Sequence, residues 1–411
     1  MRTLSTIVVA ALLALVQVTA SVSAESEPTT VSTTVTVAVG SATSATAPAP
    51  GAQVLAASSD LPPFPLEGAV PADMIGSGVW WRPVLDEAEI ERVMANLNRW
   101  GIRNCFVEAF RGGRTIYPSA IFPPEKSDGR DWLAVTCAIG RRHNVRVHAW
   151  IHTLFWRHAD DDRRTSHILD LHPQWVEMPR PGPAPQSGET KYIFVSPAIP
   201  EVRNLLVMLV DELAQREIAG VNLDYIRFQI CDRDFGYNPA TLDGFERESG
   251  LRPVDLPRET RVGSPWMRWV EYREKLVTDL VATLADRARA LAKQKGVRLL
   301  VSSAYFPGYA AERGRNFKFQ NWPEWVKRGH LDVSTPMCYA TDAEGLRREF
   351  AEVRVEHAAV PVACIPGIAL GTFTASHPLF REQRPLLEEA GFHQCMVFKY
   401  ETLRDEFEKR K

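Results

Sequence analysis

Short β-rich runs alternate strictly with helical segments along most of this chain, and this alternation constrains the fold more than any other feature. Runs rich in β-branched and aromatic residues predict eight strands, at residues 78–81, 102–107, 145–151, 220–224, 297–303, 331–336, 361–365 and 393–398. Apolar residues at helical spacing and start signals such as Asp86 and Ser264-Pro265 predict the intervening helices, among them 132–142, 200–216, 265–295 and 378–390. Eight strand and helix units favour a parallel sheet closed into a (β/α)8 barrel, the TIM-barrel fold of the α/β class. An open doubly wound sheet is the alternative, but no Gly-rich phosphate loop follows the first run.

The N-terminal residues are not expected to join the barrel. Residues 1–24 begin with one positive charge, continue with an apolar run and end in Val22-Ser23-Ala24, a pattern typical of a secretory signal peptide cleaved after Ala24. The apolar run is shorter than the roughly 20 residues that cross a bilayer, so we expect no membrane span after cleavage and a secreted or periplasmic protein. Residues 25–60 are rich in Thr, Ser, Ala and Pro and predict a disordered linker. Residues 61–411 are then expected to form a single barrel domain.

The charge balance and the cysteines narrow the class of partner and the covalent framework. Lys and Arg number 48 and Asp and Glu number 50, so the chain has no basic excess for a nucleic-acid backbone. We expect no nucleic-acid partner, and we favour a monomer. Of the six Cys, four lie in apolar strand-like or helical runs (Cys105, Cys137, Cys364 and Cys395) and two near loops (Cys231 and Cys338). A buried thiol packs as a small hydrophobe, and sequence spacing does not decide whether any pair is bridged.

Polar and aromatic side chains gather where the predicted strands end, which is the rim that carries chemistry in barrels of this type. Asp224 ends the fourth run, and the alternation of side chains along a strand directs Asn222 and Asp224 into the barrel. A carboxylate there costs several kcal/mol to desolvate unless it is paired or takes part in function. An internal salt bridge with Arg227 is the structural alternative to a working Asp224.

Carboxylates combined with aromatic faces indicate sugar chemistry. Cleavage of a glycosidic bond needs one acid that protonates the leaving oxygen and a second carboxylate that attacks or activates water. The catalytic candidates are Asp224, Asp342, Glu108 and Glu401, with Asp342 favoured as the partner of Asp224. The candidate substrate-binding residues are Trp80, Trp81, Arg82, His148, Trp150, His152, Asn222, Arg227, Tyr305, Tyr339 and Lys399. We expect the long insertion at residues 229–263 to form part of the cleft wall.

Two histidines in the third predicted strand raise the alternative of a metal-dependent hydrolase or deacetylase. His148 and His152 are spaced as His-x-Trp-x-His, and neither an HExxH nor a GxSxG motif occurs. We therefore expect these histidines to hydrogen-bond substrate or a rim carboxylate. No metal and no cofactor is predicted.

Six short segments occur in the order seen in a known family and span about residues 75–400. They are Ile116-Tyr117-Pro118-Ser119, Val147-His148-Ala149-Trp150-Ile151, His172-Pro173-Gln174-Trp175-Val176, Ser196-Pro197-Ala198-Ile199-Pro200-Glu201-Val202-Arg203, Gly220-Val221-Asn222-Leu223-Asp224-Tyr225-Ile226-Arg227-Phe228 and Pro336-Met337-Cys338-Tyr339. In this ordered set the chain resembles the glycosyl-hydrolase-like family 10. The resemblance implies an exported (β/α)8 barrel of the glycoside hydrolase class, in a family of which some members act on bacterial cell-wall glycan. It also implies that Asp224 matches the family's acidic residue on strand four.

Together, these patterns predict a secreted glycoside hydrolase that cleaves a polysaccharide or cell-wall glycan by carboxylate acid and base catalysis. The alternative from another class is a carbohydrate-binding barrel without catalysis.

Overall fold

The computed structural model describes residues 76–158, 168–182, 192–229, 233–309, 318–358, 362–371 and 377–408. The expected signal peptide, the expected linker and Cys231 lie outside these residues. The described helices include none that is long and apolar enough to cross a membrane.

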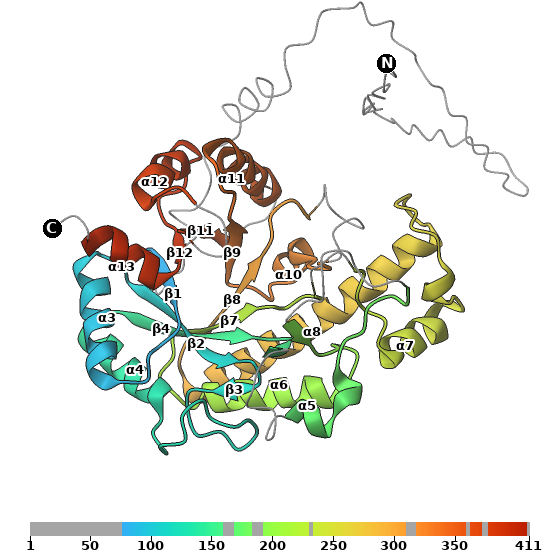
Figure 1. Ribbon diagram of the computed structural model, residues 1–411, viewed down its shortest axis with the longest axis horizontal. Helices are drawn as coiled ribbons and strands as arrows, with labels where there is room; N and C mark the ends of the chain where they lie inside the picture. Colours follow the sequence, from blue (N-terminus) through green and yellow to red (C-terminus); the bar gives the residue numbers. More distant parts are fainter. Residues whose placement is uncertain are drawn as a thin grey trace, which may run out of the picture. The chain divides into compact units, whose positions relative to one another are not determined.

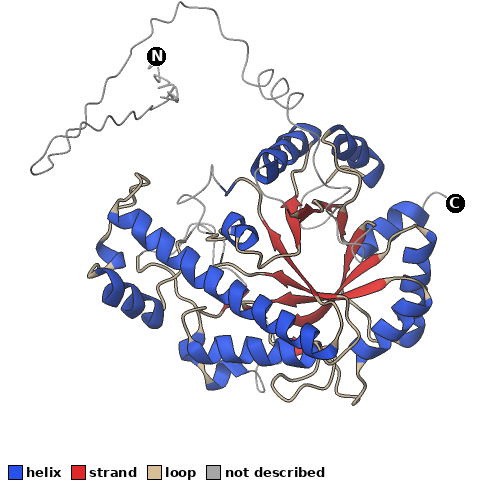
Figure 2. Ribbon diagram, turned by 180° about the vertical axis from the view of Figure 1, so that it is seen from behind, coloured by secondary structure: helices blue, strands red, loops and turns tan. Residues whose placement is uncertain are grey.

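Eight parallel strands form a closed ring, which confirms the predicted (β/α)8 barrel (Figure 2). They are β1 (Gly78–Trp81), β2 (Asn104–Arg111), β4 (Arg146–His152), β7 (Gly220–Asp224), β8 (Leu300–Tyr305), β9 (Val333–Cys338), β11 (Gly367–Ala369) and β12 (Met396–Phe398). The ring closes because β1 pairs with β2 on one side and with β12 on the other. The carboxyl ends of all eight strands therefore face the same rim.

Helices surround the strands (Figure 1). They are α3 (Glu87–Arg99), α4 (Trp132–Arg142), α6 (Pro200–Leu213), α8 (Pro265–Lys295), α10 (Trp322–Lys327), α11 (Ala343–Ala358), α12 (Phe380–Glu389) and α13 (Tyr400–Glu408). Their ends follow the predicted signals: Asp86 Oδ1 accepts a hydrogen bond from Glu89 N at the start of α3, and Ser264 Oγ accepts one from Met267 N at the start of α8. Gly296, with φ 66°, ends α8 in the left-handed conformation that favours glycine.

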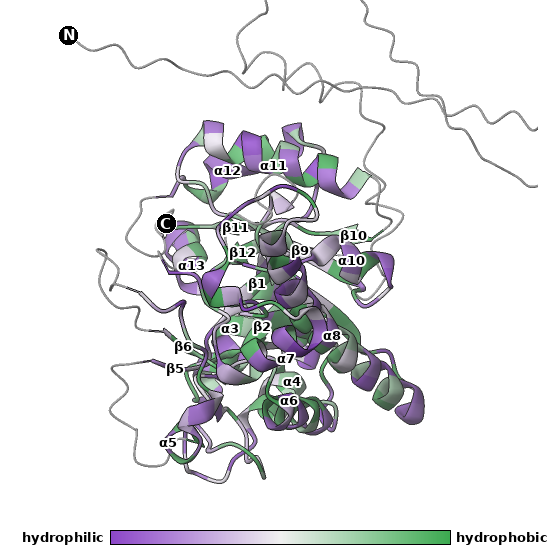
Figure 3. Ribbon diagram, turned by 90° about the vertical axis from the view of Figure 1, so that its right-hand side faces the viewer, coloured by the Kyte–Doolittle hydropathy of each residue, from purple (hydrophilic) through white to green (hydrophobic). Residues whose placement is uncertain are grey.

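Alternation along each strand divides the strand residues between two apolar layers. Val79, Trp81 and Leu223 belong to the outer layer, which packs against the helices. Trp80 and Trp150 belong to the inner layer, which fills the barrel. The barrel interior is thus a packed core, and chemistry in barrels of this type is located at the rim. In Figure 3 the strands are largely green, whereas the helices carry both green and purple residues.

The seventh strand differs from its prediction because it is interrupted. β10 (Ala363–Cys364) pairs with β9, and the chain then reaches β11, which pairs with both β9 and β12. Pro366 lies between the two pieces and has no N–H to donate to a strand ladder. The part of this strand that closes the barrel is therefore β11, beyond the predicted end of the strand.

Shorter elements lie in the loops: β3 (Arg114–Thr115), β5 (Phe155–His158), β6 (Tyr192–Phe194), α5 (Ile168–Leu171) and α7 (Pro239–Ser249). α7 belongs to the insertion after β7. A fully buried ion pair between Arg273 of α8 and Asp234 ties this insertion to the helix layer, and Tyr237 Oη donates to Asp234 Oδ2 at 2.8 Å. The cysteines within the described ranges, Cys105, Cys137, Cys338, Cys364 and Cys395, are free and buried.

Candidate active site

Two cavities open at the carboxyl ends of the strands. The Asp224 cavity, of about 240 Å³, is lined by Trp150, Tyr192, Phe194, Asp224, Tyr225, Arg227, Gln229, Phe306, Met337, Tyr339 and Phe398. The Glu108 cavity, of about 400 Å³, is lined by Trp80, Arg82, Glu108, Trp150, Gly371, Phe398 and Lys399. Trp150 and Phe398 line both cavities, so their side chains form a shared aromatic wall between two charged compartments.

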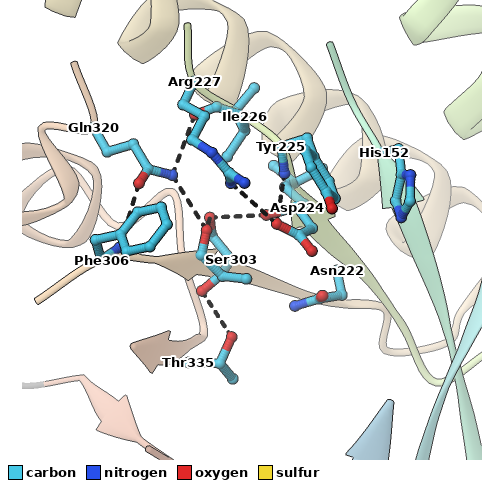
Figure 4. Close-up of polar contacts among 12 residues, drawn as sticks. His152, Asn222, Asp224, Tyr225, Ile226, Arg227, Ser303, Phe306, Gln320 and Thr335 are labelled. Atoms are coloured by element: carbon cyan, nitrogen blue, oxygen red, sulfur yellow. Dashed lines mark hydrogen bonds and ion pairs between the residues drawn. The ribbon is translucent and has the colours of Figure 1, made fainter. Parts of the chain in front are cut away.

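Asp224, the last residue of β7, is 7% exposed and is held by three donors, of which Tyr225 and Arg227 are shown in Figure 4. Trp150 Nε1 donates to Oδ2 at 3.0 Å, while Tyr225 N and Arg227 Nη1 donate to Oδ1 at 2.6 and 3.2 Å. The chain turns directly after Asp224, since Tyr225 has φ 49°. The salt bridge with Arg227, expected as the structural alternative, is therefore present, and the carboxylate nevertheless lines the cavity.

The Arg227 guanidinium combines an ion pair with contacts to two aromatic rings. It lies between two rings, with Cζ 4.5 Å from the centroid of Tyr225 and 5.2 Å from that of Phe306. Its Nη1 contacts Asp224, but its Nε is buried without a hydrogen-bond partner among the described residues. A buried guanidinium with unused donors is costly unless a ligand completes its contacts.

Gln320 holds the backbone turn that follows Asp224 (Figure 4). Sequence reasoning missed this residue. Its side chain is buried, and Nε2 donates to Ile226 O at 3.4 Å and to Ala304 O at 3.2 Å. Phe306 N donates to Oε1 at 3.3 Å. The amide thus joins the backbone that follows Asp224 to the end of β8. No local motif signals this role, because Gln320 comes from a loop distant in sequence from both partners.

Glu108 is a second buried carboxylate, and it lies close to two arginines and a histidine. Arg82 Nε lies 2.6 Å and Arg111 Nε 3.8 Å from Oε2, and His152 Nε2 lies 3.1 Å from Oε1. Burial by itself raises the pKa of Glu108, but the contacts with His152, Arg82 and Arg111 outweigh burial and hold it at about 2. Glu108 is therefore an anion at neutral pH.

The predicted histidines occupy different depths in the barrel. His148 stacks on Phe106 at 4.5 Å, and its Nε2 lies 3.3 Å from Asn104 Oδ1. Burial, together with nearby Arg146, lowers the pKa of His148 to about 3. His148 lines neither cavity, so its predicted contact with substrate is wrong. His152 faces Glu108, as expected of a histidine beside a rim carboxylate, and also lines neither cavity.

Over the described ranges, no three His, Cys, Asp or Glu side chains lie together in a group that could hold a metal ion.

Two other predicted binding residues face the helices instead of the rim. Trp81 packs against Tyr400 of α13, with ring centroids 6.1 Å apart. Tyr305 stacks on Trp322, and its hydroxyl lies 2.7 Å from His357 Nε2. Both predictions are wrong because each residue lies on the outward side of its strand.

Of the four candidate acids, only Asp224 and Glu108 line these cavities. Asp342 is exposed before α11, where its Oδ1 accepts a hydrogen bond from Gly345 N at 2.7 Å. Glu401 lies in the first turn of α13, with Oε2 3.7 Å from Lys399 Nζ. The structure thus does not bring the favoured pair, Asp224 and Asp342, together in one cavity.

The remaining predicted residues lie at or just below the rim. Trp80, Arg82, Trp150, Arg227, Tyr339 and Lys399 line the cavities. Asn222 lies beneath them, where Trp80 Nε1 donates to its Oδ1 at 3.3 Å and its Nδ2 donates to Ser302 Oγ at 2.9 Å. Burial and the nearby Asp224 raise the pKa of the Tyr339 hydroxyl well above its usual range, so the hydroxyl stays protonated.

The insertion after β7 contributes Gln229 to the Asp224 cavity, in keeping with the expectation that it forms part of the wall. Sequence reasoning missed Tyr192, Phe194, Tyr225, Phe306 and Phe398, which complete the aromatic lining. Tyr225 and Phe398 directly follow or end predicted strands, so their positions carried a usable signal. Tyr192 and Phe194 lie on β6, outside the eight predicted strands.

Comparison with known proteins identifies a family and two similar folds. The family model described as Glycosyl hydrolase-like 10 matches residues 75–374. No curated protein matches the chain. The fold is similar to the PgaB (BpsB) glycoside hydrolase domain from Bordetella bronchiseptica, with 14% sequence identity, a TM-score of 0.63, and coverage of 82% of this chain and 97% of that one. It is also similar to the catalytic domain of β-amylase from Paenibacillus polymyxa, with 12% identity, a TM-score of 0.57, and coverage of 82% and 94%.

Proposed function

The chain belongs to the glycosyl hydrolase-like 10 family, and we propose that it is a secreted enzyme that hydrolyses glycosidic bonds in a polysaccharide or cell-wall glycan. One observation carries the proposal: the buried carboxylate of Asp224 lies at the rim of the barrel in a cavity lined mainly by aromatic rings. Aromatic rings suit the apolar faces of sugars, and a rim carboxylate suits glycosidic cleavage.

The two carboxylates that line the cavities have different roles in this proposal. Asp224 exchanges a proton with the glycosidic oxygen or with the attacking water. Glu108 stays ionised on the other side of the Trp150 and Phe398 wall, where its ion pair with Arg82 holds that side chain beside the sugar. Its pKa of about 2 supports this role, because a group ionised at neutral pH is not a proton donor.

The surrounding side chains bind and orient the sugar. The shared wall of Trp150 and Phe398 offers a stacking surface to a sugar in either cavity. The protonated Tyr339 hydroxyl donates a hydrogen bond to a sugar oxygen. Asp224 itself is oriented by Trp150 and by the turn at Tyr225.

Release of reducing ends from a panel of polysaccharides and cell-wall glycans tests the proposal. We expect activity from the wild type and a loss of roughly 10²- to 10⁴-fold in Asp224→Asn, with an unchanged melting temperature. Asp342→Asn is the matched control and should retain activity within about twofold, since that carboxylate caps a helix. An equal loss in both variants would restore Asp342 as the acid partner.

A carbohydrate-binding barrel without catalysis is the second candidate, and the engagement of Asp224 by three donors favours it. Binding of a glycan without release of reducing ends from any member of the panel would establish it in place of the hydrolase. Loss of activity in a chelator, reversed by added metal, would instead support the metal-dependent alternative.

Secretion is proposed from the signal-peptide pattern of residues 1–24. Expression of the full chain followed by N-terminal sequencing of the exported protein tests it. The expected first residue is Glu25, and retention of the intact N-terminus inside the cell would contradict the proposal.

A further inference from the structure

The charged side chains of the two cavities leave cationic groups incompletely paired. Each cavity holds one carboxylate with an arginine against it: Asp224 with Arg227, and Glu108 with Arg82. Lys399 is a further cation in the Glu108 cavity. The lining residues therefore carry three positive and two negative groups, although the whole chain has a formal charge of −2. This excess concerns the lining residues, and Glu401, whose Oε2 lies 3.7 Å from Lys399 Nζ, is a further carboxylate just outside that lining.

Lys399 is weakly engaged by the protein. Its Nζ lies 3.7 Å from Glu401 Oε2, which is beyond hydrogen-bonding distance. Glu401 Oε2 has no hydrogen-bond partner within the described part of the chain. The Lys399 side chain is 44% exposed. An ammonium group with three donors thus faces a cavity with capacity for a ligand oxygen.

Arg227 provides a second, independent indication in the other cavity. Its side chain is 8% exposed, and the rings of Tyr225 and Phe306 fix its plane. Nη1 is turned to Asp224 and Nε is enclosed by the protein, but the guanidinium lines the cavity and so places a positive charge beside a bound ligand. A carboxylate offers two oxygens and a negative charge to a guanidinium, whereas a hydroxyl group offers one neutral oxygen.

We propose that the substrate is an acidic glycan whose sugars carry carboxylates, of the uronic-acid class. In one cavity Lys399 and the exposed Arg82 contact a sugar carboxylate, and in the other Arg227 does so. Trp150 and Phe398, shared by both cavities, pack against the strand between them. This inference rests on the proposed function for its glycan substrate and adds the charge of that substrate.

Matched ligands distinguish the effect of the carboxylate charge on binding from the effect of the sugar ring and its linkage. Oligosaccharides of galacturonic, glucuronic and mannuronic acid are each compared with their methyl esters, which keep the ring and the linkage but remove the charge. Binding is measured by calorimetry with the Asp224→Asn protein, so that the glycan is not consumed. We expect at least one acid to bind roughly tenfold more tightly than its ester, with a preference that weakens as salt is raised.

The variant Lys399→Gln tests the assigned contact. It should weaken binding of the preferred acid roughly tenfold and leave its ester unaffected. Lys275→Gln is the matched control, because Lys275 is exposed on α8 and pairs with Asp279 away from the cavities. The control should bind both ligands as the parent protein does, and unchanged melting temperatures exclude misfolding.

Equal binding of acids and esters, or no binding of either, would overturn the inference. So would a preference that Lys399→Gln leaves intact, or tighter binding of sulfated oligosaccharides than of any uronic acid. These outcomes differ from failure of the proposed function: cleavage of neutral glycans alone would retain the hydrolase and reject the acidic substrate. Preferential binding of acids without any release of reducing ends would retain the acidic ligand and reject the hydrolase.

Discussion

Trp150 Nε1 donates a 3.0 Å hydrogen bond to Asp224 Oδ2, and the ring of Trp150 lines both cavities at the barrel rim. The residue that orients the proposed catalytic carboxylate is therefore part of the wall on which we propose that the sugar packs. Substrate seated on this wall contacts the same indole that fixes the carboxylate. Binding and catalysis should consequently be coupled through one side chain.

The first prediction concerns Trp150→Phe, which keeps an aromatic wall but removes the indole N–H. We expect the turnover number to fall roughly 10- to 100-fold, because a hydrogen bond to a charged group contributes about 1.5–3 kcal/mol. Steady-state kinetics on the best glycan of the panel measure the effect. Trp325→Phe is the control: it removes a buried 2.9 Å bond from Nε1 to Thr278 Oγ1 and should lower stability without slowing turnover. Equal kinetic effects in the two variants would contradict the coupling.

The second prediction concerns Glu108 and acid stability. Its pKa in the folded protein, about 2, lies below the ordinary value of 4.5 for a glutamate, so ionised Glu108 stabilises the fold above about pH 4.5 and this contribution is lost as pH falls towards 2. Glu108→Gln should be less stable by roughly 3 kcal/mol at pH 7, because one pKa unit corresponds to about 1.4 kcal/mol. Denaturant unfolding from pH 2.5 to 7 should show the two stability curves converging in acid. Parallel curves would show that the cations around Glu108 do not stabilise its ionised form.

The third prediction concerns Gln320 as a positioning residue for Asp224. Gln320→Leu removes the bridge between Ile226 O and the end of β8, so we expect a lower turnover number with a smaller change in KM. Asn96→Leu serves as the control for structural damage, which lowers stability without affecting the site. It removes a buried hydrogen bond of 3.1 Å that Asn96 Nδ2 donates to Tyr400 Oη on the outer side of the barrel. The control should lose stability and keep its turnover number. The same kinetics in both variants would reject a positioning role.

The fourth prediction concerns Glu177, a buried acid outside both cavities. Burial, offset in part by hydrogen bonds from Met178 N and Asn238 N, raises its pKa from 4.5 to about 7. The folded state then binds more protons than the unfolded state between these values, so stability falls as pH rises from about 4.5 to 7. Glu177→Gln keeps an acceptor oxygen for both N–H groups and should be more stable than wild type at pH 8, by roughly 1–3 kcal/mol, but not at pH 4. Thermal melts across this range check the sign, with exposed Glu259→Gln as the neutral comparison.

Most of the strands and helices could be predicted from the sequence, because local patterns such as helix caps and apolar runs mark where they begin and end. Asp86 and Ser264 begin helices where their side chains cap the backbone, and β1 and β7 have their predicted bounds. The seventh strand was displaced because Val362 to Ile365 reads as a continuous apolar run, whereas the strand that closes the barrel follows Pro366. Apolar patterning locates a buried strand but does not identify its hydrogen-bonded partner.

The candidate site was less accessible, since it depends on side-chain direction and on loops. Trp80 and Trp81 look equivalent in sequence, yet one lines a cavity and the other packs under α13. Asp224 was identified because strand alternation directs it inward at the end of a well-defined strand. Asp342 was favoured from its strand alone, but the next turn of chain uses its carboxylate as a helix cap. Gln320 acts across three segments, and no spacing in a single chain reveals such a contact.

Closure of the ring also has a consequence for how the protein is made. β1 is completed by β12, and Cys395 N bonds to Ser77 Oγ across a sequence separation of 318 residues. While the chain emerges during synthesis, the first strand has one unpaired edge until β12, the last strand described, is available. Exposed strand edges are templates for aggregation. The C-terminal segment therefore closes the barrel, and loss of β12 and α13 would leave an open sheet with two unpaired edges. A segment more than 170 residues beyond Asp224 in sequence thus protects the edge of the first strand during folding.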